Sequence, residues 1–105
     1  MISLNQVKND LNQIKSYLYT KYDVESIYIF GSYAREEQTE KSDIDILVDF
    51  KHTPDLLTFI EIEDYMSQKL KTPVDLVPKR KLKLQIKDQI LQEAIAVWKG
   101  TIYFF

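Results

Sequence analysis

Two aspartates one residue apart carry the clearest sign of chemistry in this sequence. Asp43 and Asp45 lie in the run SDIDILVDF, where most of the other residues are apolar. Residues two apart on a strand point to the same face, so the two carboxylates are expected side by side. Two such charges about 4 Å apart repel by roughly 4 kcal/mol at an effective dielectric constant near 20. Either a shared proton or a cation must offset this repulsion. A hard divalent ion with oxygen ligands does so most directly, and Mg²⁺ is the common choice when phosphates are also present.

An isolated Asp-x-Asp also has an ordinary structural interpretation, in which Asp43 caps a loop and Asp45 lies on an exposed edge. Two further features favour chemistry. Gly31 and Ser32 follow the apolar run SIYIF at a strand-to-helix junction, where free backbone N–H groups and a glycine favour phosphate. Asp75 interrupts the apolar run PVDLVP, although alone it could be a strand-end residue facing water. If these strands are neighbours, three carboxylates converge.

Three carboxylates beside a phosphate-binding turn match the needs of two-metal phosphoryl transfer. One ion would neutralise the phosphates of a nucleotide, and the other would lower the pKa of an attacking hydroxyl. The third carboxylate is the natural proton acceptor. If the strands are neighbours, Asp43, Asp45 and Asp75 are therefore candidate metal ligands and catalytic residues.

The hydrophobic pattern predicts the elements that position these residues. A helix is predicted over residues 3–19, opened by a capping box at Ser3 and Gln6. A second helix is predicted to end near Leu70, with Thr53 as its cap and Pro54 in its first position. Its inward-facing residues are expected to be Leu56, Phe59, Ile60, Met66 and Leu70.

Three strands are predicted at residues 26–30, 43–50 and 72–78, and a last helix at residues 82–97. The order α-β-α-β-α-β-α indicates a single α/β unit. The apolar tail TIYFF could add a strand or meet a partner. The basic run KRKLKLQIK is best interpreted as a solvated helix face, with contact to RNA or an acidic partner as the alternative.

Composition limits the class of protein. The chain has 105 residues, of which 45% are hydrophobic, so one small folded domain is expected. Its formal net charge of -2 gives no general attraction to nucleic acid or membranes. It has no cysteine and no apolar run of membrane-spanning length, so we expect a cytoplasmic protein without a membrane partner.

Together, GSYAR, SDIDILV and VDLV resemble the motifs of the minimal nucleotidyltransferases of the DNA polymerase β-like superfamily, and ILQEAIAVW is similar to the family's last helix. The matching positions are Gly31, Ser32, Ala34, Arg35, Ser42, Asp43, Asp45 and Asp75. The resemblance implies the α/β nucleotidyltransferase (polymerase β-like palm) fold, with a small mixed sheet and helices packed mainly on one face. Residues 1–105 would form a single minimal nucleotidyltransferase domain.

The resemblance also implies a function. Two Mg²⁺ ions would be held by the three aspartates, and ATP would be the substrate, with its β- and γ-phosphates gripped by Gly31 and Ser32. Ser42 would join the cofactor-binding residues, and Arg35 would hold either phosphate or the polar loop, with a structural salt bridge as the alternative. AMP would pass to a hydroxyl, such as a tyrosine of a HEPN-domain ribonuclease toxin, which the chain would neutralise as an antitoxin.

Three functional hypotheses remain open at this point. The first is this adenylyltransferase, in a hetero-oligomer with its HEPN partner and without nucleic acid as a direct partner. The second is a non-catalytic antitoxin that inhibits a HEPN partner by binding alone. The third is a transferase acting on a small molecule or an RNA end. One departure from the family pattern bears on nucleotide preference, because Glu36, Glu37 and Gln38 replace the usual Gly-x-Ala.

Overall fold

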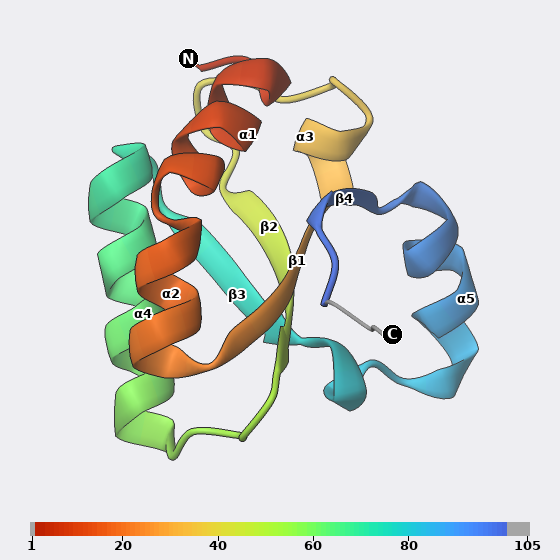
Figure 1. Cartoon of the computed structure of the whole chain (residues 1–105). Helices are drawn as coiled ribbons and strands as arrows, with labels where there is room; N and C mark the ends of the chain where they lie inside the picture. Colours follow the sequence, from red (N-terminus) through yellow and green to blue (C-terminus); the bar gives the residue numbers. More distant parts are fainter. Residues whose placement is uncertain (1, 101–105) are drawn as a thin grey trace.

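The sheet that carries the aspartates has four strands in the order β3-β2-β1-β4 (Figure 1). It is seen in a computed structural model that describes residues 2–100. The strands are β1 Val24–Phe30, β2 Ile44–Phe50, β3 Val74–Pro78 and β4 Ile95–Trp98. β1 is antiparallel to both β2 and β4, whereas β2 and β3 are parallel. The predicted small mixed sheet is therefore confirmed.

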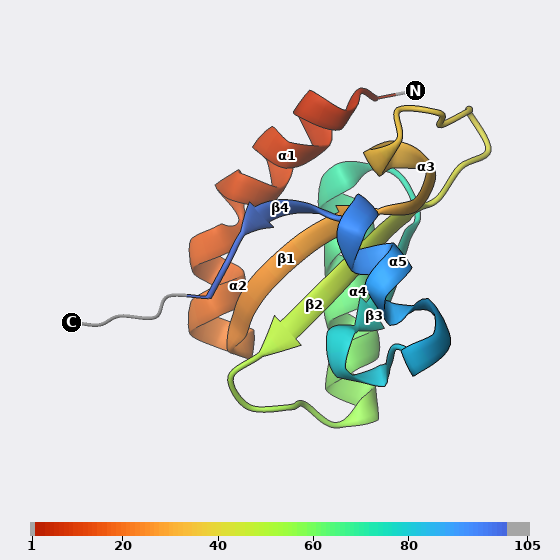
Figure 2. The ribbon, with the colours of Figure 1, turned by 90° about the vertical axis from the view of Figure 1, so that its right-hand side faces the viewer.

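Three helices cover one face of the sheet, and one crosses the other face (Figures 1 and 2). The covering helices are α1 Leu4–Gln13, α2 Lys15–Tyr22 and α4 Leu56–Leu70. On the other face, β3 leads through a short 3₁₀ turn, η1 Lys79–Lys81, to α5 Leu84–Glu93. The helices thus pack mainly on one face, as expected. Within residues 2–100, none of them is long and apolar enough to span a bilayer.

The side chains of β2 alternate between the two faces of the sheet. Ile44, Ile46 and Val48 are buried in the main hydrophobic core, whereas Asp45 and Leu47 belong to the opposite face. The helices and β1 complete this core with Val7, Leu11, Leu18, Ile27, Ile29, Ile62, Met66 and Leu70. The face of β2 that carries Asp45 is therefore separate from the face that supplies most of the hydrophobic stabilisation.

The single helix predicted over residues 3–19 is in fact two helices. Ser3 caps α1 as predicted, since its Oγ accepts the N–H of Gln6 at 3.1 Å. At Ile14 the N–H bonds the Leu11 carbonyl three residues back, and this tighter turn separates α1 from α2. The predicted buried stripe nevertheless continues across the break, because Ile14 itself is buried.

The prediction that Thr53 caps α4 is wrong. Asp55 is the cap, because its Oδ1 accepts the N–H of Thr58 at 2.8 Å. The inward stripe of α4 runs through Phe59, Ile62, Met66 and Leu70, at spacings of three and four. Two residues that we expected to face inward instead project into solvent, with Leu56 72% and Ile60 50% exposed.

The last predicted helix, over residues 82–97, ends too late. α5 stops at Glu93, and Ile95–Trp98 forms β4 along the edge of β1, so this part of ILQEAIAVW is not helical. Ile95 and Val97 are β-branched, and they meet an unpaired strand edge that can accept their backbone hydrogen bonds. The tail TIYFF lies outside the described residues.

Replacing Asp55 by alanine should lower the melting temperature by a few degrees at pH 7, whereas replacing Thr53 by alanine should leave it unchanged. The hydrogen bond from Thr58 holds the pKa of Asp55 below its ordinary value. The cap therefore stabilises the fold above the unfolded-state pKa, and this stabilisation is lost as pH falls through the folded-state pKa. Thermal unfolding of both variants between pH 7 and pH 2 tests this, and equal effects of the two substitutions would contradict it.

Candidate active site

The turn after β1 brings the backbone directly against Asp45. Gly31 begins α3, Gly31–Ala34, with a φ of +71°, in the left-handed region that glycine adopts readily. A Cβ atom at Gly31 would lie 2.2 Å from Asp45 Oδ2. The backbone angle therefore favours glycine, and a larger residue would also force the Asp45 side chain to move. Ser32 follows in the same short turn and is partly buried.

Asp45 and Asp75 are register partners in the parallel pairing of β2 with β3. Partners in neighbouring strands lie about 4.8 Å apart and point to the same face. Partial burial raises the pKa of Asp45, and the negative charges of Asp75 and then Asp43 raise it further, whereas Arg35 lowers it. The structure thus brings Asp75 beside the Asp-x-Asp pair and leaves their charges poorly balanced.

Asp43 and Ser42 belong to the loop that enters β2. Asp43 is exposed just before the strand begins. Ser42 Oγ accepts the N–H of Thr39 at 2.9 Å, and the N–H of Ser42 donates to the Thr39 carbonyl at 3.0 Å. Ser42 therefore closes the loop in front of Asp43. Its place among the cofactor-binding residues stays a prediction.

The three carboxylates suit a hard divalent cation, but they do not already surround a common point. In the part of the chain that the structure describes, no three acidic or histidine side chains are gathered closely enough to hold a metal ion. The donors are nevertheless the oxygen ligands that Mg²⁺ prefers. The pKa of Asp45 is raised first by burial and then by the charges of Asp75 and Asp43, and a cation would balance those two charges. The residues therefore fit Mg²⁺, provided that their side chains rotate toward one ion.

Arg35 connects the turn to α5. Its Nε lies 2.9 Å from Glu37 Oε1, and its Nη1 lies 2.8 Å from Glu93 Oε1. These two carboxylates raise the pKa of Arg35, so the guanidinium stays charged. Of the three roles considered for Arg35, the structure shows two, a salt bridge to Glu93 and a contact to Glu37 of the polar loop. Phosphate binding by Arg35 stays a prediction.

A cavity of about 300 Å³ opens beside Gly31, between the end of β1 and α5. Its lining residues are Phe30, Gly31, Arg35, Ile86, Gln89, Ile90 and Glu93. The α5 residues were missed in the sequence analysis. Ile86 and Ile90 lie four residues apart and Glu93 three further on, so one face of this helix was recognisable from spacing alone. The position of this helix face across from Gly31 could not be predicted from spacing.

Glu36 occupies a conformation that favours glycine. Its φ is +56°. The family resemblance leads us to expect the glycine of Gly-x-Ala at this position. A side chain with a Cβ costs about 1–2 kcal/mol in this left-handed region. The loop therefore holds Glu36 in a backbone conformation that glycine would adopt without this cost.

Replacing Glu36 by glycine should raise the free energy of unfolding by about 0.5–1 kcal/mol, because the relief of strain exceeds the entropy that glycine adds to the unfolded state. Glu40→Gly, in the same loop but without a positive φ, is the matched control and should lower it. Urea denaturation measures both. Equal destabilisation by the two substitutions would show that Glu36 is not strained.

Comparisons with known proteins agree with this geometry. A Methanocaldococcus jannaschii protein, provisionally named as a protein adenylyltransferase, is 53% identical over 98 residues, covering 92% of this chain and 100% of the relative. A crystal structure of a toxin–antitoxin complex with AMP-PNP matches with a TM-score of 0.70 at 26% identity, over 94% of this chain and 75% of the matched chain. The complex of a tri-AMPylated Shewanella oneidensis HEPN toxin with its MNT antitoxin gives 0.66 at 26% identity, over 90% and 73%.

The family model described as polymerase beta, nucleotidyltransferase matches residues 12–100, which include every motif residue discussed above. The match spans the glycine turn, both strands that carry aspartates, and α5. The chain belongs to the polymerase beta nucleotidyltransferase family, as its resemblance to the minimal nucleotidyltransferases implied.

Proposed function

We propose that this nucleotidyltransferase moves AMP from ATP to a tyrosine hydroxyl of a partner HEPN ribonuclease toxin, and that this modification neutralises the toxin. The observation that carries the proposal is the pairing of Asp45 with Asp75 directly beside Gly31. This pairing places two carboxylates, which can accept a proton from a nucleophile, next to a turn. A phosphate can approach the backbone of that turn closely because glycine has no side chain.

The transfer follows from the chemistry of these groups. The hydroxyl oxygen attacks the α-phosphorus of ATP, the bond from that phosphorus to the bridging oxygen breaks, and pyrophosphate leaves. Asp75 is more exposed than its partner Asp45, and it accepts the hydroxyl proton. Gly31 and Ser32 receive the β- and γ-phosphates, because the missing Cβ lets these oxygens reach the backbone.

Mg²⁺ is the cofactor of this proposal, with Asp43, Asp45 and Asp75 as its ligands. When bound, two ions would neutralise phosphate charge and lower the pKa of the attacking hydroxyl. The carboxylates themselves hold negative charge at the ends of β2 and β3, where Asp45 is partly withdrawn from water.

The partner is proposed from the relatives. One solved neighbour is a complex of an MNT antitoxin with an AMPylated HEPN toxin, and another holds AMP-PNP, an analogue of ATP, in a toxin–antitoxin complex. Protein adenylyltransferase is also the activity provisionally named for the Methanocaldococcus jannaschii relative. The match covers the whole of that relative and 92% of this chain. An assembly of this chain with a HEPN protein would place the acceptor hydroxyl on the partner.

The purified chain, incubated with ATP, Mg²⁺ and its HEPN partner, should add one or more AMP units to the partner, as measured by intact mass. Asp45→Asn should reduce this transfer to background, because it removes a carboxylate from the pair. Asp49→Asn is the matched control, on the same strand and face but paired with Ser26 at the other end, and should retain transfer.

Two results would separate this proposal from inhibition by binding alone. An unmodified partner whose ribonuclease activity is still blocked, equally by the wild-type chain and by Asp45→Asn, would overturn AMP transfer and support the binding mechanism. Transfer that persists in Asp45→Asn would show that the catalytic residues are elsewhere.

Glu37 and Glu93 compete with phosphate for Arg35 in this proposal. Replacing either by glutamine should tighten AMP-PNP binding by roughly twofold to fivefold, since an exposed ion pair no longer occupies the guanidinium. Glu36→Gln is the control, because it changes the net charge of the same loop without touching Arg35. Calorimetric titration measures all three, and weaker binding in the Glu93 variant would show that Glu93 instead orients Arg35 productively.

A further inference from the structure

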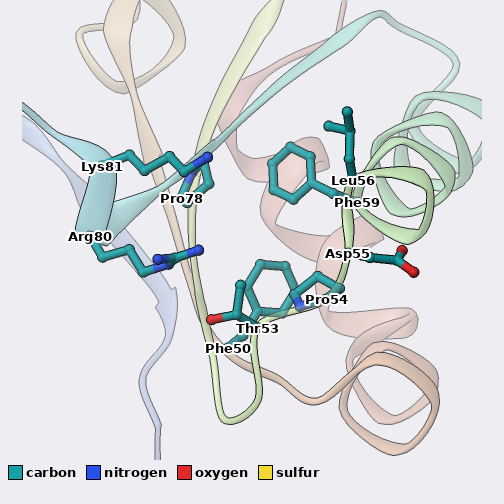
Figure 3. A pocket seen from close by; sticks show the side chains of 9 residues that line it. All are labelled: Phe50, Thr53, Pro54, Asp55, Leu56, Phe59, Pro78, Arg80 and Lys81. Carbon is teal, nitrogen blue, oxygen red and sulfur yellow. The ribbon is translucent and has the colours of Figure 1, made fainter.

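We propose a second binding site at the opposite end of the sheet, for a partner-protein segment that carries an apolar side chain next to an acidic one. A cavity of about 190 Å³ opens between the start of α4 and the turn after β3 (Figure 3). It begins at Phe50, five residues along β2 from Asp45, which corresponds to roughly 17 Å in an extended strand. The proposal stands whether or not AMP transfer occurs.

The walls of this cavity are apolar. Phe50 and Phe59 contact each other edge to face, with ring centroids 6.2 Å apart, and Pro54 and Pro78 lie beside them. The surface continues outward over the first turns of α4, where Leu56 and Leu57 are 72% and 80% exposed. The exposed leucines therefore extend the apolar surface of the cavity, and a continuous exposed apolar surface of this kind marks a site of protein interaction.

The rim of the cavity is basic. Figure 3 shows the side chains of Arg80 and Lys81 extending from η1 toward the cavity, opposite the start of α4. Within the described part of the chain, neither forms a salt bridge. Asp55 is the acidic residue of this cavity, but its carboxylate is bonded to the N–H of Thr58 and points away from both cations. An incoming carboxylate would therefore complement the rim.

These features favour a protein segment over nucleic acid. Two cations could hold a phosphate, but the exposed leucines and the phenylalanine-lined cavity would then stay in contact with water. A peptide with a leucine or phenylalanine beside glutamates covers the apolar surface and pairs with Arg80 and Lys81 in one arrangement. The basic run that begins at Lys79, interpreted above as a solvated face, thereby acquires a binding role.

The test uses the ¹⁵N-labelled full chain and a defined probe, the peptide acetyl-Glu-Glu-Leu-Phe-Glu-Glu-amide, followed by NMR up to millimolar peptide. The shifts should be confined to residues around the cavity, including Phe50, Phe59 and Arg80. A counterpart with lysines in place of the glutamates, and one with serines in place of the apolar pair, should each bind at least about tenfold more weakly.

Variants of the chain complete the test. Arg80→Glu/Lys81→Glu should weaken binding of the glutamate peptide at least about tenfold. The control Lys8→Glu/Lys69→Glu carries the same change in charge on α1 and the end of α4 and should bind normally. Leu56→Ser/Leu57→Ser should also weaken binding, and it replaces only exposed side chains, so the fold is retained.

Other occupants would give different results, and each would overturn the proposal. Shifts at the same residues that depend on the concentration of the chain alone would assign the surface to a second copy. Shifts that appear on deleting residues 101–105 would assign it to that segment. Tighter binding of a short single-stranded RNA than of the peptide would assign it to nucleic acid, and equal binding of the lysine peptide would exclude acidic recognition.

Discussion

The close approach of Gly31 to Asp45 joins the glycine turn to the strand that carries the aspartates, at the proposed active site. It depends on the antiparallel pairing of β1 with β2, in which Phe30 is the partner of Asp45. A slip of one residue would turn Asp45 into the hydrophobic core and Ile46 out of it, so the buried face of β2 enforces the register. The parallel pairing with β3 then brings Asp75 to the same place. Packing on one face of the sheet thus determines the geometry on the other.

The ionised carboxylates of the site repel one another, and the rest of the fold must offset this unfavourable electrostatic energy. The raised pKa of Asp45 means that its ionised form is disfavoured by burial and by Asp75 and Asp43. Arg35 offsets part of this charge, but it is shared with Glu37 and Glu93. A carboxylate whose pKa is shifted by burial and by neighbouring charges is typical of functional sites. It is tolerated because the core residues of α1, α2 and α4 lie on the opposite face.

The strands and the spacing of the aspartates could be predicted from sequence, because both depend on local alternation and on punctuation by Gly and Pro. Asp45 and Asp75 were expected to converge only if their strands were neighbours, and the βαβ connection through α4 supplies that adjacency. The resemblance to nucleotidyltransferases added the order of the motifs, which composition alone does not contain.

The errors share a physical cause, which is dependence on distant or competing partners. Ile95–Trp98 is a strand because it pairs with the edge of β1. The local sequence pattern of this segment contains no information about that distant edge. The start of α4 was misplaced because Thr53 and Asp55 are both acceptable caps, and only Asp55 bonds Thr58. Glu93 went unnoticed because its partner Arg35 is 58 positions away.

α5 differs from the other long helices in having no buried residue. It is held by the Arg35–Glu93 ion pair, by partial contacts from Ile86 and Ile90, and by its covalent links to η1 and β4. Segments with so little buried apolar surface open at free energies well below that of global unfolding. One wall of the cavity beside Gly31 can therefore detach while the sheet and its three covering helices stay intact. In the proposed function, this opening would give ATP a route into and out of the cavity without disturbing the strand register that pairs Asp45 with Asp75.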